Sequence, residues 1–250
     1  MQNHTAIVTG AAGQIGRATT HKLLQGGAQV LMVDADQAAL DEAAHAMDGR
    51  VETAVCDVRD SEQVASYVKT CEQHFGQVDA FFNNAAIEGD MQPLTEYDEA
   101  TFQKVLDINV KGVWLGCKHV MPAMARSGGG SIVITSSVAG LTGTPNLLAY
   151  TTSKHAVIGI MRTAAKEGAP QGIRANTINP GPIESRMMQA IEEGNQPEQP
   201  EQVHQAFESQ IPMGRYGRAE EVARLAVFLL SGDSTYANGA VFPLDGGFTA

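Results

Sequence analysis

The chain has 250 residues and a formal net charge of -11, and 43% of its residues are hydrophobic while 18% are charged. This composition is typical of a globular protein with a full core, and it excludes a disordered chain. The negative charge, without any Lys/Arg-rich run, argues against nucleic acid or an anionic membrane as a partner.

Short apolar strands alternate with amphipathic helices along the whole chain. The alternation is typical of βαβ units and predicts a single α/β domain over residues 1–250, with a Rossmann-type doubly wound parallel sheet and helices on both faces. The expected strands are Thr5–Thr9, Gln29–Val33, Val51–Cys56, Val78–Phe82, Ser131–Thr135, Ile173–Ile178 and Ala240–Pro243. The expected helices are Gly16–Gln25, Gln37–Met47, Glu62–Phe75, Thr101–Met124, Tyr150–Glu167 and Glu220–Leu230.

A glycine-rich turn, Thr9–Gly16, joins the first expected strand to the first helix. A dinucleotide fold needs glycines here, because they allow a tight turn and a close approach of the backbone to the pyrophosphate. The free N–H groups at the start of the helix would face the phosphates. Asp34 ends the second strand, where a carboxylate can accept hydrogen bonds from the adenosine ribose. The alternatives are an ordinary glycine turn and a turn-forming aspartate.

Polar residues follow several other strands. Asp57 follows the third strand, Asn83–Ala86 ends the fourth, and Ser136 and Ser137 follow the fifth. Ligands of open parallel sheets bind in the crevice at the carboxyl ends of the strands, so these side chains are expected to share one site.

The long Thr101–Met124 helix carries a broad apolar stripe that contains one amide, Asn109. An amide on such a stripe must find partners or cost stability, so a satisfied structural amide is the favoured interpretation on this ground alone.

Lys154 follows Tyr150 by four positions, which places them on one face of a helix. A tyrosine with a pKa of about 10 is a poor acid–base group at neutral pH, but a neighbouring ammonium favours the phenolate. We therefore expect Lys154 to lower the pKa of Tyr150. An exposed amphipathic pair is the alternative, and a serine at the preceding strand end makes it less favoured.

Taken together, these motifs resemble the short-chain dehydrogenase/reductase family, in its short single-domain branch, over essentially the whole chain. The resemblance rests on the glycine turn, Asp34, Asp57, the NNAA segment, INVKG, ITSSVAG, YTTSK, NPGPIES and LDGG. It implies an NAD-dependent enzyme that interconverts a secondary alcohol and a ketone by hydride transfer.

The resemblance also implies roles for individual residues. Tyr150 would be the general acid–base, and Ser137, thirteen residues earlier, would hydrogen-bond the substrate oxygen. Lys154 would bind the nicotinamide ribose, and Asn109 would hold a water of a proton relay. The implied cofactor-binding residues are Gly10, Gly13, Gln14, Ile15, Gly16, Asp34, Asp57, Val58, Asn84, Ala85, Tyr150, Lys154, Pro180, Gly181, Ile183 and Ser185.

Three motifs depart from the family pattern. Gln14 stands where TGxxxGxG has a glycine, and Gly13 stands one place early, so the pyrophosphate turn is expected to be slightly rearranged. Ala86 replaces the glycine of NNAG, and Ser185 replaces a threonine but keeps the hydroxyl.

NAD is the expected cofactor because residues 35–38, after Asp34, contain no cation and include a second acid. Arg17 is the nearest positive charge, and it is expected to lie on the helix surface. No metal is implied, since the seven histidines are scattered.

Three alternatives remain open. The glycine spacing also occurs in sugar-nucleotide epimerases and dehydratases, but 250 residues leave no room for their larger C-terminal domain. A 3-oxoacyl-(acyl-carrier-protein) reductase is a second alternative, against which the charge of -11 argues because the carrier is acidic. A non-catalytic dinucleotide-sensing protein is expected to lose one of Ser137, Tyr150, Lys154 or Asn109.

The substrate itself is not determined by the sequence. We expect a mostly apolar pocket formed by Ile87, Val138, Leu141, Asn146, Leu147, Met187 and Met188. The polar segment Ile191–Gln202, rich in Gln, Glu and Pro, predicts a mobile surface loop within a substrate lid at about 184–212.

The assembly and location are further expectations. The apolar stripe on Thr101–Met124 is broader than one core face needs, and small residues on Tyr150–Glu167 allow close helix approach. Relatives pair these two helices across a two-fold axis, which implies a homotetramer. The chain shows no signal peptide, and its three cysteines suit reduced thiols, so a cytoplasmic location is expected.

Overall fold

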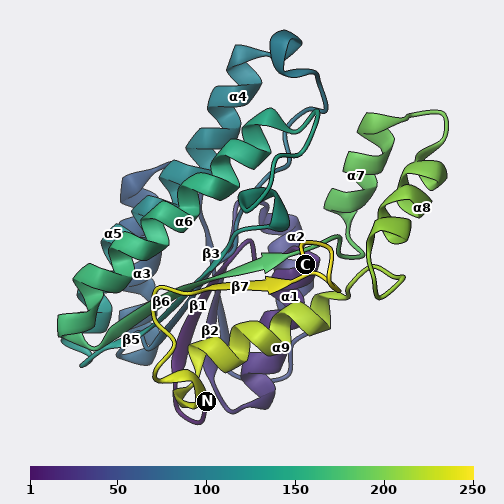
Figure 1. Ribbon diagram of the computed structural model, residues 1–250. Coiled ribbons are helices and arrows are strands. Elements are labelled where there is room, and N and C mark those ends of the chain that lie inside the picture. Colours follow the sequence, from purple (N-terminus) through teal and green to yellow (C-terminus); the bar gives the residue numbers. More distant parts are fainter.

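Seven strands form one parallel sheet in the computed structural model, which describes residues 1–250 (Figure 1). The strands are β1 (Thr5–Thr9), β2 (Gln29–Asp34), β3 (Val51–Val55), β4 (Ala80–Asn83), β5 (Gly130–Thr135), β6 (Ile173–Pro180) and β7 (Val241–Leu244). Their order is β3-β2-β1-β4-β5-β6-β7, so the direction of winding reverses between β1 and β4. The predicted doubly wound sheet is confirmed, and its reversal point is where such sheets bind ligands.

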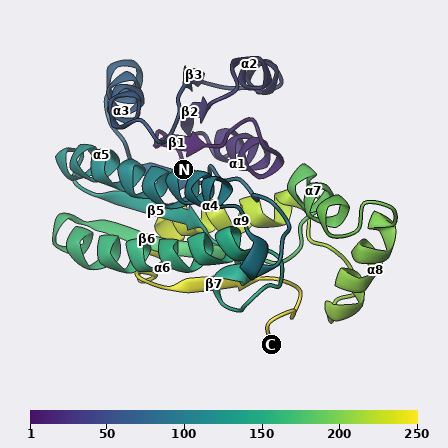
Figure 2. The same ribbon diagram turned by 90° about the horizontal axis from the view of Figure 1, so that it is seen from above.

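Helices cover both faces of this sheet (Figures 1 and 2). The helices are α1 (Gln14–Gln25), α2 (Gln37–His45), α3 (Ser61–Phe75), α4 (Glu99–Leu106), α5 (Gly112–Arg126), α6 (Leu148–Gly168), α7 (Arg186–Asn195), α8 (Pro200–Gln210) and α9 (Ala219–Leu230). Residues of α3, α5 and α6 pack in one hydrophobic core, and residues of α1, α2 and α9 pack in a second.

The period-2 geometry of the strands explains the two cores. Phe81 belongs to one core and Phe82 to the other, although they are neighbours in β4. Successive side chains of a strand point to opposite faces, and strands covered on both faces therefore read as continuous apolar runs. This is why β1, whose sequence is TAIVT, is buried throughout.

The predicted Thr101–Met124 helix is interrupted by a π-helical turn at Asp107–Lys111, between α4 and α5. Asn109 lies in this turn and is fully buried. Its amide oxygen accepts a hydrogen bond from the backbone N of Ile87 at 2.9 Å, and its Nδ2 donates to the carbonyl of Ile87 at 2.8 Å. The buried amide is therefore satisfied, and it ties this helix to the segment after β4.

The prediction of a loop at Ile191–Gln202 is wrong. This stretch contains the end of α7 and the start of α8, joined by residues 196–199, and the two helices project from the body of the molecule (Figures 1 and 2). Pro200 occupies the first turn of α8, where a proline costs no hydrogen bond. Ile191 and Glu192 are buried, so α7 has one side that faces inward. The polar composition of the segment gave no indication of this side.

None of the helices combines the length and hydrophobicity that a bilayer-spanning segment requires.

Candidate active site

A cavity of about 770 Å³ is lined by residues that follow β1, β2, β3, β4, β5 and β6. All of the predicted site residues line it except Gly16 and Asn109. The cavity runs continuously from Asp34, at the end of β2, to Tyr150 on α6 and Met188 on α7. The fold thus assembles one site from residues that are widely separated in the sequence.

The glycine turn approaches the segment after β4 closely. Gly10 has a φ of +62°, and a Cβ there would lie 2.9 Å from the Cα of Ala85. A side chain on Gly16 would overlap the carbonyl oxygen of Gly10. Contacts within the protein therefore require glycine at positions 10 and 16, independently of any cofactor.

Gly13 differs from the other two glycines of the turn. A Cβ there would contact only the Gly10 carbonyl, at 3.4 Å, and Gly13 is exposed on the cavity wall at the N-terminus of α1. A side chain at this position would fill space next to the free N–H groups of the helix, which is where a pyrophosphate binds. The turn therefore fits a dinucleotide.

The carboxylate of Asp34 is held by the backbone at the cavity wall. One oxygen accepts from the N–H of Ala12 at 2.9 Å, and the other accepts from the N–H of Ala35 at 2.8 Å. Arg17 also lines the cavity rather than lying only on the helix surface, which corrects the expectation. Its guanidinium donates to Glu42 at 2.9 Å, to the carbonyl of Ala12 at 2.8 Å and to the carbonyl of Ala39 at 3.4 Å, so each of its three nitrogens has a partner in the protein.

Asp57 is engaged by a residue that sequence reasoning missed. Arg59, two residues later, donates to both carboxylate oxygens, with an Nη2–Oδ2 distance of 2.6 Å. These hydrogen bonds, first of all, hold the pKa of Asp57 below its ordinary value. The signal in the sequence was the spacing of Asp and Arg by two positions in a turn, which indicates an ion pair only weakly.

Asn84 connects three strand ends at the floor of the cavity. Its Nδ2 donates to the carbonyl of Thr9 at 3.2 Å, and its Oδ1 accepts from the hydroxyl of Thr135 at 3.0 Å. The hydroxyl of Thr9 accepts from the N–H of Ala85 at 3.2 Å. The side chain of Asn84 thus holds β1, β4 and β5 in register at the site, and its cofactor contact stays a prediction.

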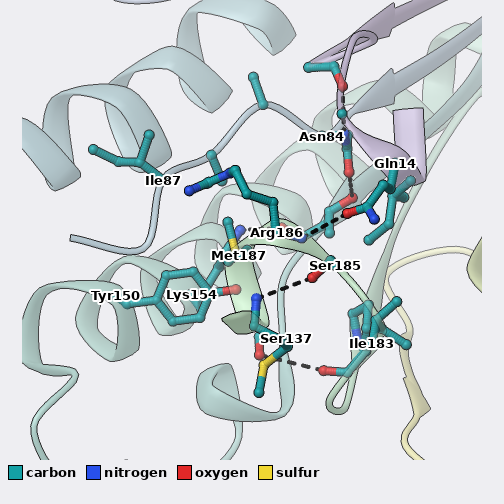
Figure 3. A pocket seen from close by; sticks show the side chains of 18 of the residues that line it. Gln14, Asn84, Ile87, Ser137, Tyr150, Lys154, Ile183, Ser185, Arg186 and Met187 are labelled. Atoms are coloured by element: carbon teal, nitrogen blue, oxygen red, sulfur yellow. Dashed lines mark hydrogen bonds between the residues drawn. The ribbon is translucent and has the colours of Figure 1, made fainter. Parts of the chain in front are cut away.

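Ser137, Tyr150 and Lys154 come together at one end of the cavity (Figure 3). All three are at least nine-tenths buried. The Nζ atom of Lys154 lies 5.3 Å from the centre of the Tyr150 ring and donates to the carbonyl of Thr135 at 2.8 Å. The Oγ atom of Ser137 accepts from the N–H of Ala139 at 3.1 Å, which orients the hydroxyl.

Burial dominates the titration of this group. Loss of hydration raises the pKa of Tyr150 to about 12, although a hydrogen bond with Ser137 acts in the opposite direction. The same cause lowers the pKa of Lys154 to about 7. Lys154 was expected to lower the pKa of Tyr150, but this pKa is raised instead. Desolvation is the largest effect on the pKa of both Tyr150 and Lys154.

The free energy of unfolding is expected to depend on pH through Lys154. Between pH 7 and 10.5 the unfolded chain carries a proton on this lysine that the folded chain lacks. The contribution of Lys154 to stability therefore rises with pH across this window, by up to about 1.4 kcal/mol per pH unit, and is constant below it.

Chemical denaturation without added cofactor measures this effect. Buried thiols and tyrosines titrate in the opposite direction, so the wild type is compared with Lys154→Met at each pH. The wild type should gain stability relative to the variant as pH rises from 7 towards 10.5. Parallel curves would show that Lys154 keeps its ordinary pKa in the folded chain.

Asn109 lies behind the site rather than on its wall. Its Nδ2 also donates to the hydroxyl of Ser153 at 3.0 Å, and this hydroxyl donates to the carbonyl of Tyr150 at 2.7 Å. Asn109 therefore supports the helix turn that carries Tyr150 and Lys154. Its role in a proton relay stays a prediction.

Beyond β6, Ile183 and Ser185 line the cavity at the start of α7. The hydroxyl of Ser185 accepts from the N–H of Met188 at 3.2 Å and caps this helix. Serine at this position therefore has a structural function, in addition to the predicted contact with the nicotinamide.

The expected substrate pocket is partly corrected. Ile87, Val138, Leu147, Met187 and Met188 line the cavity, whereas Leu141 and Asn146 do not. Sequence reasoning missed Ile191, Phe207 and Phe248, which also line it. Phe207 is the one Phe, Tyr or Trp residue of the polar helix α8, and a single large apolar residue in a polar segment could have indicated a position that faces the cavity.

Comparisons with known proteins agree with this geometry. The family model described as enoyl-(acyl carrier protein) reductase matches residues 10–249. Levodione reductase of Leifsonia aquatica is 39% identical over 99% of this chain and 95% of its own length. The 3-oxoacyl-[acyl-carrier-protein] reductase of Thermotoga maritima is 37% identical, with 99% and 98% covered, and a 2,5-dichloro-2,5-cyclohexadiene-1,4-diol dehydrogenase of Sphingobium indicum is 37% identical, with 100% and 98% covered.

Solved structures are equally similar. The crystal structure of levodione reductase has a TM-score of 0.97 at 38% identity, with 99% of this chain and 98% of that chain covered. That of NAD⁺-bound xylitol dehydrogenase has a TM-score of 0.92 at 34% identity, with 98% and 99% covered.

The fold and site define a nicotinamide-dinucleotide-dependent oxidoreductase. The chain belongs to the short-chain dehydrogenase/reductase family, whose members interconvert alcohols and carbonyl compounds.

Proposed function

We propose that the chain is an NAD-dependent dehydrogenase that interconverts a secondary alcohol and a ketone on an apolar ring. The observation that carries this proposal is the position of Tyr150. Its hydroxyl shares one end of the cavity with Ser137, while its ring packs in a cluster with Leu147 and Ile191. Met187, Met188 and Phe207 pack against the same cluster. A polar pair beside an apolar surface suits a carbonyl or hydroxyl carried on a hydrocarbon body.

One of the relatives supports a ring-shaped substrate. It is named for a cyclohexadiene-1,4-diol, which is a six-membered ring with two secondary hydroxyl groups. The methionines of the cluster are flexible and can adapt to ring substituents of different shapes.

In the oxidative direction, Tyr150 as phenolate takes the proton of the alcohol. Bound NAD supplies the acceptor for the hydride. Ser137 donates a hydrogen bond to the substrate oxygen, and with Tyr150 it stabilises the charge that develops there. Lys154 places a positive charge near the phenol when protonated, which favours the phenolate.

The preference for NAD is also a proposal. It is supported by the carboxylate of Asp34 on the cavity wall and by the engagement of Arg17 with Glu42 and the carbonyl of Ala12. Residues 35–38 add no cation there.

A reductase of acyl-carrier-protein thioesters is the second candidate, favoured by the match to the Thermotoga maritima enzyme. The net charge of -11 opposes it, because docking of an acidic carrier would meet repulsion.

A substrate panel tests the two candidates. Cyclohexanol and 1,4-cyclohexanediol are compared with xylitol in the oxidative direction, and 1,4-cyclohexanedione with acetoacetyl-CoA in the reductive direction, by absorbance of the reduced nicotinamide. We expect the ring compounds to have kcat/KM values about tenfold or more above the others, which is the discrimination that pocket contacts usually provide. A higher value for acetoacetyl-CoA would favour the second candidate, and one for xylitol would exclude an apolar substrate class.

The homotetramer and the cytoplasmic location stay predictions. Trp114 on α5 is half exposed, and Thr152 and Gly159 on α6 are exposed, so both helices carry uncovered surface that suits pairing with a second copy. Light scattering at micromolar concentration should give four times the chain mass of 26.5 kDa. A monomer would contradict the expectation.

A further inference from the structure

The first residue of α7, Arg186, is bound to both sides of the cofactor cleft. Its backbone N–H donates to Oε1 of Gln14 at 2.9 Å, and Gln14 is the first residue of α1, within the glycine-rich segment. Its guanidinium donates to both carboxylate oxygens of Glu88, at 2.8 and 3.0 Å. Glu88 follows β4 on the other side of the cleft. Figure 3 shows Gln14 reaching across to the backbone of Arg186.

These contacts involve the residue that departs from the family pattern. A glycine at position 14 could not provide an acceptor for α7. The N–H of Arg186 is one of the free donors at the start of that helix, and Gln14 satisfies it while Ser185 satisfies the N–H of Met188. The side chain of Glu88 is only 13% exposed, so its carboxylate is oriented toward Arg186 rather than free in solvent.

A dinucleotide that extends from Asp34 to Tyr150 must lie across the place where the glycine turn meets the segment after β4, because residues of both segments line the cavity. Arg186 connects the same two segments through Gln14 and Glu88. We propose that Gln14, Arg186 and Glu88 form a clasp that holds α7 across the cofactor cleft and slows release of the dinucleotide. This proposal rests on the proposed function, since it assumes that the cleft binds a nicotinamide dinucleotide.

The contacts of the clasp are weak enough to break and re-form. The side chain of Arg186 is 69% exposed and Gln14 is exposed, so water competes for each of these contacts. Exposed hydrogen bonds and ion pairs contribute little individually, and loss of one is expected to change a rate about two- to tenfold. We treat the three residues as positioning residues, which act through α7.

Release of NADH is measured by stopped-flow displacement, following the fluorescence of the bound cofactor. Gln14→Met keeps the length of the side chain and the backbone N–H but removes the acceptor. Glu88→Ala removes the partner of the guanidinium. Both should release NADH about two- to tenfold faster than the wild type. Glu193→Ala is the matched control, since Glu193 is an exposed acid on α7 that makes no contact with the clasp, and it should release NADH at the wild-type rate.

The same variants separate the clasp from a direct contact between Arg186 and the cofactor phosphates. If Arg186 bound phosphate, Glu88→Ala would free its charge and slow the release, which would overturn the proposal. Release at the wild-type rate in both Gln14→Met and Glu88→Ala would overturn it as well.

A second measurement uses the protein without cofactor. Hydrogen exchange at the N–H of Arg186 should be faster in Gln14→Met than in Glu193→Ala, and equal exchange would show that the contact does not form. A wild type that binds no NADH would instead contradict the proposed function.

Discussion

Replacing Tyr150 with phenylalanine is expected to lower kcat by about 10²–10⁴-fold, which is the usual contribution of a positioned acid–base group. Only the hydroxyl is lost, and the ring still packs in its apolar cluster with Leu147 and Ile191. The hydroxyl is hydrogen-bonded to Ser137, and the Nζ atom of Lys154 lies 5.3 Å from the centre of the ring. Neither Ser137 nor Lys154 can replace the hydroxyl as a proton acceptor at the substrate oxygen.

The measurement is steady-state turnover of the best ring substrate, together with the Kd for NADH from fluorescence titration. The Kd should stay close to the wild-type value, because Lys154 and the glycine turn are unchanged. Tyr67→Phe is a matched control, since Tyr67 is a buried tyrosine of α3 outside the cavity, and its turnover should be nearly normal. A Tyr150→Phe enzyme that kept more than about a tenth of the wild-type rate would contradict the mechanism.

The wild type is expected to prefer NAD over NADP by about 10- to 1000-fold in kcat/KM, at about 1.4 kcal/mol per tenfold. Asp34 is the expected reason, because its carboxylate lies on the cavity wall at the end of β2, where a fold of this kind binds the adenosine ribose. A phosphate on that ribose would face this carboxylate, and two charges about 4 Å apart repel by several kcal/mol at an effective dielectric of about 20. Arg17, the nearest cation, is engaged by Glu42 and the carbonyl of Ala12.

The experiment compares kcat/KM for the two cofactors in the wild type and in Asp34→Ala. The substitution should reduce the ratio by about tenfold or more, mainly by improving the use of NADP. Asp41→Ala removes an acid on α2 that does not line the cavity, and it should leave the ratio unchanged. A wild type that prefers NADP, or an unchanged ratio in Asp34→Ala, would exclude Asp34 as the selecting residue.

Much of the fold was predictable because burial imposes a period on the sequence. The bounds of the seven strands differ from those expected by at most two residues. The central strands are the clearest in the sequence, since strands covered on both faces are apolar runs. The gathering of Asp34, Asp57 and Ser137 at one cavity followed from parallel pairing, which brings the carboxyl ends of the strands to one edge.

The helices α7 and α8 were not predictable in the same way. They pack mainly against each other and the cavity, so only a few residues, such as Ile191 and Phe207, face inward. A short amphipathic helix with one narrow apolar side has nearly the composition of a solvated loop. The ion pair of Arg59 with Asp57 was equally invisible, because side-chain orientation in a turn does not follow a period.

The sequence by itself determined the class of fold, the place of the site and the kinds of groups that it contains, because periodic burial and glycine positions are local properties. Only the tertiary structure decided the environment of those groups. Burial raises the pKa of Tyr150, although its spacing from Lys154 predicted a lower one, and it also lowers the pKa of Lys154, since desolvation depends on every element packed around them. Likewise, Gln14 departs from the family pattern, and its hydrogen-bond partner could not be read from the sequence. The partner, Arg186, is 172 residues away and reaches Gln14 only through folding.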